Sequence, residues 1–266
     1  MLGTTKNRIR PFFLSMTLVL VAFPRGVNAQ SYPTDVLITW AFENNKGWLA
    51  FGRGDYNTAE RRFNAAIKTL RRHEAEDQRL LARSYYDLSL ALHAQERYAD
   101  AEPLAAWVLR VRERDPRTRA DTLFDSIRLL ADIHRELGRN AEAETLLRQA
   151  LDIEERNTPP DDPGPAFTLM DIADVVVRQE KFEEADALLR RAIATLRHYG
   201  GAPSPALADA LDSRANVLDH LKRPEEARAA EAEARRIRED VREAAEPGAA
   251  DPVKPATPSP PAPPRP

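Results

Sequence analysis

The chain has 266 residues, a net charge of -3, 42% hydrophobic residues and 30% charged residues. This balance allows a packed core, and it argues against a nucleic-acid-binding domain, which would carry a strongly basic surface. The absence of cysteine excludes disulfides, thiolate metal sites and cysteine nucleophiles.

The first 29 residues have the three parts of a secretory signal peptide. Lys6, Arg8 and Arg10 precede an uncharged run from residue 11 to residue 23, and the stretch 27–29 resembles a cleavage site before Gln30. This pattern predicts an exported protein, in a bacterial periplasm or secreted. The apolar run is shorter than the roughly 20 residues that span a bilayer, so we expect no membrane span in the mature chain. An uncleaved N-terminal anchor is the alternative.

A repeat with a period of 42 residues runs through most of the remaining chain. Similar segments begin at Gly54, Glu96, Gly138, Glu180 and Lys222. Five residues into each segment stands an alanine: Ala59, Ala101, Ala143, Ala185 and Ala227. Seven residues further on stands a second small residue: Ala66, Val108, Ala150, Ala192 and Ala234. A fixed period of this length indicates a repeat architecture.

The spacing inside each repeat is helical. Intervals of three, four and seven residues place the small residues on one helix face, and Phe63, Leu147 and Leu189 lie between them. Another column of small residues precedes each segment: Gly47, Ser89, Ala131, Ala173 and Ala215. The pattern therefore predicts an all-α fold in which each repeat is two antiparallel amphipathic helices, joined at a turn that carries glycine or a polar residue.

These columns resemble the tetratricopeptide repeat, and the 42-residue period is similar to the longer kinesin-light-chain class. The segment from Gln95 to Leu104 (QERYADAEPL) is the most similar stretch. The resemblance implies a right-handed α-solenoid of about five repeats, near 40–81, 82–123, 124–165, 166–207 and 208–242, within a helical domain spanning residues 30–242. It is specific for the fold and says little about the function.

The two ends of the array depart from the pattern. Glu43 and Lys46 stand where later repeats have apolar residues, and Glu231 replaces the large apolar residue of the last repeat. Polar residues at these positions predict end caps that face solvent. After residue 242 the chain is rich in proline and alanine, which predicts an extended or disordered tail over residues 243–266.

No motif in the sequence predicts catalysis, a cofactor or a metal site. The five histidines do not pair at metal-ligand spacing, and His134 falls in a core column, where we expect a structural role. Acid–base catalysis would need carboxylates that converge in a pocket, and no spacing in the chain implies one. We therefore predict that the protein is not an enzyme.

The resemblance implies a concave face, lined by the first helix of each repeat, as the place where a protein or peptide would bind. The candidate residues on that face are Asn44, Trp48, Phe51, Arg83, Tyr86, His93, Arg128, Asp132, Arg135, Met170 and Asp174. Trp48 and Tyr86 are predicted as apolar anchors, and Arg128 and Arg135 as partners for acidic groups, because aromatic and arginine side chains dominate binding hot spots. The alternative is that Trp48 and Phe51 pack against the N-terminal extension.

Three functions fit this sequence. The first is an exported scaffold that binds another protein, the second a membrane-tethered spacer, and the third a binder of a small ligand. We favour the scaffold, because no convergent polar site is visible and the repeat itself forms an extended surface. The partner's identity and the oligomeric state are left open by the sequence.

Overall fold

A computed structural model describes residues 33–72, 78–159, 162–199 and 204–245 of the chain. The predicted signal peptide lies outside these residues, and so does the tail from residue 246 onward.

The described residues form ten α-helices and no strand. The helices are α1 (Thr34–Gly52), α2 (Tyr56–Arg71), α3 (Arg79–Ala94), α4 (Tyr98–Arg114), α5 (Ala120–Glu136), α6 (Asn140–Asn157), α7 (Gly164–Val177), α8 (Phe182–Tyr199), α9 (Pro205–His220) and α10 (Pro224–Ala245). The all-α prediction is confirmed. The last helix continues three residues beyond the predicted end of the domain at 242, and it begins at Pro224, where a missing N–H costs little.

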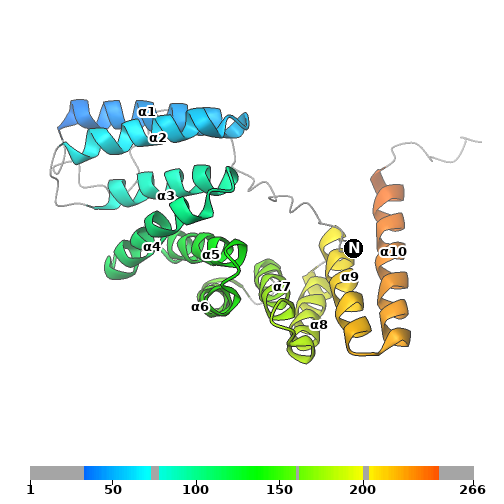
Figure 1. The fold of residues 1–266 in the computed structure, drawn as a ribbon. Helices are drawn as coiled ribbons and strands as arrows, with labels where there is room; N and C mark the ends of the chain where they lie inside the picture. The colour runs from blue at the N-terminus through cyan, green and yellow to red at the C-terminus, as the bar shows by residue number, and fades with distance from the viewer. Residues whose placement is uncertain (1–32, 73–77, 160–161, 200–203, 246–266) are drawn as a thin grey trace, which may run out of the picture.

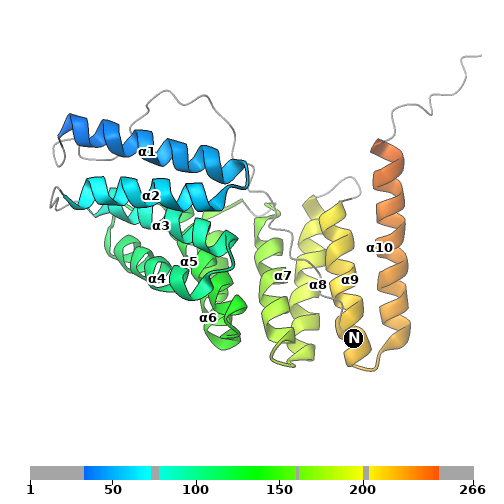
Figure 2. The same ribbon diagram turned by 45° about the horizontal axis from the view of Figure 1, so that its top comes forward.

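Each helix packs against the next one along the chain, so five antiparallel pairs stack into a curved row (Figures 1 and 2). Helices α3, α5, α7 and α9 follow the inner side of the curve, and α4, α6 and α8 follow the outer side (Figure 1). This arrangement is a helical-repeat solenoid. None of the described helices is long and apolar enough to cross a bilayer.

Small residues let the two helices of each pair approach closely. Ala59, Ala101, Ala143 and Ala185 are completely buried, and Ala227 is almost so. Phe63, Leu147 and Leu189 fill the space between the small columns as predicted. The buried apolar side chains form three clusters along the row, and neighbouring clusters meet at the partly buried residues Leu81 and Leu146.

The turn inside each repeat has the same backbone geometry every time. The residues at the start of each repeated segment, which are Gly54, Glu96, Gly138, Glu180 and Lys222, all have φ between 58° and 76°. In each turn the next residue donates its backbone N–H to a carbonyl five residues earlier, as Asp55 does to Ala50. This Schellman-type closure satisfies the last carbonyls of the first helix, and it requires a left-handed residue at the same register in all repeats.

The prediction of a polar cap on the first repeat is wrong. Glu43 turns toward α2, where it pairs with Arg62 at 3.0 Å, and Lys46 lies over the ring of Phe42. The outer face of α1 instead exposes Ile38, Phe42 and Leu49. Around the helix, Lys46 lies at one edge of the apolar stripe and Glu43 lies further round on the same side, so neither residue covers this face.

Candidate protein-binding face

The eleven candidate residues all lie on α1, α3, α5 and α7, the first helices of four successive repeats. They fall into two groups. One group lies on α1 and α3, and the other lies on α5 and α7. The structure therefore supplies two polar clusters along the inner helices, with different degrees of burial.

In the first group, a buried carboxylate joins the first two repeats. Asp87 of α3 accepts hydrogen bonds from the side chains of Asn44 and Trp48 on α1. Asp87 and Asn44 are both almost completely buried, and Oδ2 of Asp87 and Oδ1 of Asn44 have no hydrogen-bond partner among the described residues. Burial raises the pKa of Asp87 to about 6, against the opposing effects of Arg83 and of the two hydrogen bonds.

Trp48 is therefore part of the internal framework rather than a free anchor. Its ring packs edge-on against Phe51 at 5.3 Å and against Phe63 of α2 at 5.7 Å, and its indole N–H is used by Asp87. Phe51 in turn packs against Tyr56 at 5.2 Å. Both rings are half-buried through contacts inside the first two repeats, so their predicted role as a binding surface is reduced to their exposed edges.

A cation–π stack lies next to this cluster. The guanidinium of Arg112 at the end of α4 lies 4.6 Å from the ring centroid of Tyr86, and it donates to Oγ of Ser126 on α5 at 2.6 Å. Burial raises the pKa of Tyr86. Arg83 is exposed, with its guanidinium 5.7 Å from the Trp40 ring centroid, so it is the group of this cluster that a partner can reach.

His93 lies at the end of α3, against the ring of Tyr98 at 5.2 Å. Burial lowers the pKa of His93, and its Nε2 has no hydrogen-bond partner in the described part of the chain. His93 is thus a neutral, half-buried group with one free polar atom.

The second group is a charged cluster shared by α5 and α7. Arg128 donates a hydrogen bond to Asp171, and Arg135 lies 3.1 Å from Asp132. Burial raises the pKa of Asp132 and of Asp171, and Arg128 opposes this rise in both. Asp174 is more exposed and pairs at 3.2 Å with Arg178, which directly follows the last residue of α7.

Arg128 and Arg135 are therefore already neutralised by carboxylates of the protein itself. The prediction that they capture acidic groups of a partner would require these pairs to break, and breaking a partly buried pair is costly. Met170 packs its side chain partly into the core, so it contributes little free surface.

Three important residues of these clusters were missed at the sequence level: Asp87, Arg112 and Asp171. Asp87 and Asp171 occupy the same column of the repeat, two residues before the small column, where the third repeat has Leu129. A carboxylate in a column where the third repeat has a leucine was the available signal. Arg112 had no such signal, because it reaches Tyr86 from the second helix of the repeat.

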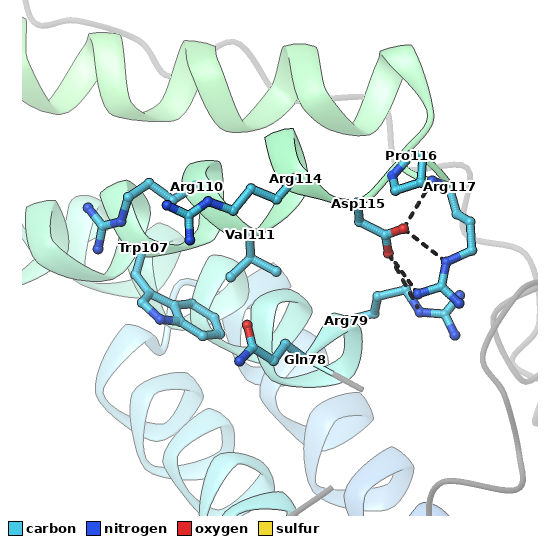
Figure 3. A pocket seen from close by; sticks show the side chains of 9 residues that line it. All are labelled: Gln78, Arg79, Trp107, Arg110, Val111, Arg114, Asp115, Pro116 and Arg117. Atoms are coloured by element: carbon cyan, nitrogen blue, oxygen red, sulfur yellow. Dashed lines mark hydrogen bonds and ion pairs between the residues drawn. The ribbon is translucent and has the colours of Figure 1, made fainter. Parts of the chain in front are cut away.

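Two cavities lie away from both clusters. One cavity, of about 460 Å³, lies beside the end of α4 and the start of α3. Figure 3 shows the residues that line it, which are Gln78, Arg79, Trp107, Arg110, Val111, Arg114, Asp115, Pro116 and Arg117. Asp115 pairs there with Arg117 at 2.9 Å and lies 3.9 Å from Arg79. Another, of about 480 Å³, lies among α8, α9 and α10. None of the eleven candidate residues lines either cavity.

The described residues contain no group of three histidine or carboxylate side chains arranged to hold a metal ion. His134 is mostly buried and lies 3.5 Å from Glu102, which agrees with the structural role expected from its core column.

Comparison with known proteins places the chain in a family. The tetratricopeptide repeat pattern matches residues 81–114, 122–198 and 168–240, which together span more than half of the chain. No curated protein matches the sequence.

Several solved structures share the fold at low sequence identity. A candidate kinesin light chain of Podosopora anserina with nearly identical TPR-like repeats is 16% identical, with a TM-score of 0.67 over 76% of this chain and 95% of that one. BtubC (BKLC) from P. vanneervenii is 18% identical, with a TM-score of 0.65 over 79% and 93%. The Rap conjugation gene regulator of plasmid pLS20, solved with the Phr* peptide, is 17% identical, with a TM-score of 0.53 over 78% and 55%. With its 42-residue helix pairs, its buried alanine columns and these matches, the chain belongs to the tetratricopeptide repeat family.

Proposed function

We propose that this protein is an exported scaffold whose inner helices bind an extended or helical segment of another protein. Its fold is one used for protein interaction, and the Rap regulator of plasmid pLS20 has been solved in complex with a peptide. The observation that carries the proposal is the charged cluster of Arg128, Asp132, Arg135, Asp171 and Asp174, which presents fixed donors and acceptors along two adjacent repeats.

The charge of this cluster selects the kind of partner. It holds two arginines and three carboxylates, of which Asp174 also pairs with Arg178, and burial disfavours the charged form of Asp132 and Asp171. A uniformly acidic segment would meet repulsion here, whereas a segment with both basic and apolar side chains would add a positive charge beside Asp132, Asp171 and Asp174. We therefore expect a partner segment of mixed polarity rather than the acidic one expected from the arginines alone.

The test is a crosslinking capture from a native cell-envelope extract with two matched variants. Asp174→Arg changes an exposed residue of α7 that pairs with a residue four positions later. Asp152→Arg changes an exposed residue of α6, on the outer side of the row, that forms the same kind of pair with Arg156 at 2.7 Å. A partner held by the wild type and by Asp152→Arg, and lost with Asp174→Arg, supports binding on the inner helices. Equal capture by all three proteins places the partner elsewhere and contradicts the proposal.

Export rests on the charged start, the apolar run and the stretch before Gln30. We expect the intact mass of the protein, isolated from fractionated cells, to correspond to a chain that begins at Gln30. A full-length mass in the membrane fraction would instead favour the tethered spacer.

A further inference from the structure

The outer face of α1 carries an apolar stripe that no part of the described chain covers. Ile38, Phe42 and Leu49 are the large hydrophobic side chains exposed in the described residues, each by more than half of its surface. Their spacing of four and seven residues places them on one side of the helix. Lys46 borders the stripe, with its ammonium 4.0 Å from the Phe42 ring centroid.

The corresponding positions of the later repeats show how such a face packs. One period later, the same positions are Leu80, Ser84 and Ala91 of α3, and all three are buried. Leu80 packs with Trp40 and Leu70 of the first repeat, and Oγ of Ser84 accepts a hydrogen bond from the Trp40 indole at 2.8 Å. The later repeats bury the two columns of Phe42 and Leu49 as well: Ser126, Ile133, Thr168, Val175, Ala210 and Val217. The α1 stripe therefore corresponds to the stacking face of the later repeats, at the end of the row where the described residues begin.

We propose that two copies of this chain pair through the α1 stripe, with their α1 helices antiparallel. A twofold axis near residues 43 and 44 sets Ile38 of each copy opposite Leu49 of the other and brings the two Phe42 rings close to the axis. The stripe is thus complementary to itself, as a twofold interface requires. This surface is separate from the inner-helix clusters.

The charges at the ends of α1 match the same arrangement. Asp35 lies in the first turn of the helix and Arg53 directly follows its last residue, and both are exposed. Antiparallel pairing brings Asp35 of each copy beside Arg53 of the other, and it also opposes the two helix dipoles favourably. Parallel pairing would set like charges together. Charge complementarity therefore selects a second copy in the antiparallel orientation over a random apolar contact.

The area that the α1 stripe can bury limits the affinity of the dimer. Stable protein interfaces bury about 1,200–2,000 Å² in total. One pair of 19-residue helices offers less than this, so we expect a reversible dimer in the micromolar range.

The test is sedimentation velocity of the protein as it is isolated from the cells that produce it, over a wide range of protein concentrations. Wild type should pass from monomer to dimer. Phe42→Asp should weaken the dimer at least tenfold with unchanged helicity and melting temperature, since residue 42 is exposed. Lys68→Asp, at an exposed position of α2, is the control and should leave the dimer intact.

A charge swap tests the orientation. Asp35→Arg and Arg53→Asp should each weaken the dimer by about 2- to 30-fold, because two symmetry-related pairs are lost, and the double variant should restore it. A monomer at all concentrations, or a dimer insensitive to Phe42→Asp, overturns the proposal. Failure of the double variant to restore pairing overturns the antiparallel arrangement.

Discussion

A Cβ atom on Gly47 of α1 would lie 2.4 Å from Cε1 of Phe63 on α2. This distance is far below van der Waals contact, and the Phe63 ring is completely buried and has little room to move. The first repeat therefore combines the smallest residue with the largest one at this contact, where the third repeat combines Ala131 with Leu147 at the same register.

We expect Gly47→Ala to lower the free energy of unfolding by about 1–3 kcal/mol, because overpacking outweighs the better helix propensity of alanine. Combining it with Phe63→Leu recreates the contact of the third repeat. The loss in the double variant should be at least about 1 kcal/mol smaller than the sum of the two single losses. Urea unfolding of the four proteins measures this coupling, and simple additivity would show that the two residues do not share a site.

The left-handed turn residues predict a stabilising substitution. Glu180 has φ of 60° where the third repeat has Gly138 at 76°. A non-glycine residue in this conformation is strained by about 1–2 kcal/mol, although glycine also costs more entropy on folding. We therefore expect Glu180→Gly to raise the free energy of unfolding by up to about 1 kcal/mol, and Gly138→Ala to lower it by about 1 kcal/mol. Thermal unfolding measures both changes. A loss of stability in Glu180→Gly would show that another contact of Glu180 dominates.

A cross-repeat ion pair predicts a loss of stability in acid. Nζ of Lys181 lies 2.9 Å from Oε2 of Glu144, at the register where Arg97 pairs with Glu60 at 2.8 Å. Burial by itself would raise the pKa of Glu144, but the hydrogen bonds from Lys181, Gln179 and Arg148 hold it at about 2. Because the folded pKa lies below the ordinary value of 4.5, this contribution is complete above about pH 5 and disappears as the pH falls toward 2.

We expect Glu144→Gln to lose about 1 kcal/mol at pH 7, and the difference from wild type to shrink as the pH falls from 5 to 2. The exposed residue Asp152 serves as the control, because Asp152→Asn should change stability by less than about 0.5 kcal/mol. Denaturant unfolding at several pH values makes the measurement. A difference that is constant with pH would rule out the ion pair as its cause.

Asp87 predicts the opposite dependence on pH. Its folded pKa of about 6 lies above the ordinary value of 3.8 because of burial. The folded protein then binds more protons than the unfolded chain between these values, so stability falls as the pH rises from 4 to 6 and is level above about 7. We expect Asp87→Asn to remove this dependence and to be more stable than wild type at pH 8 by an amount of order 2 kcal/mol, since its amide can donate to Oδ1 of Asn44. Denaturant unfolding of both proteins from pH 4 to 8 tests this prediction. If the free energy of unfolding depends on pH equally in the two proteins, the raised pKa of Asp87 is refuted.

Much of the fold could be predicted from local pattern. The 42-residue period, the alanine columns at Ala59 and Ala143, and the turn positions at Gly54 and Gly138 depend on contacts within one helix pair. Helical spacing alone encodes such contacts, and the structure confirms each of these features. The prediction for the α1 end face is wrong because Glu43 reaches toward Arg62 of α2 and Lys46 lies over the ring of Phe42, so the apolar face beside them stays exposed.

The candidate site was predictable only in its location. The sequence by itself determined that polar and aromatic residues such as Trp48, Tyr86 and Arg128 lie on the first helices. Only the tertiary structure decided what those groups do, since Arg128 meets Asp171 from the next repeat and Trp48 meets Asp87. The physical reason is that a helical period places a side chain on a face, whereas its charge partner depends on how neighbouring repeats stack, and residues some forty positions apart become neighbours only in the folded solenoid.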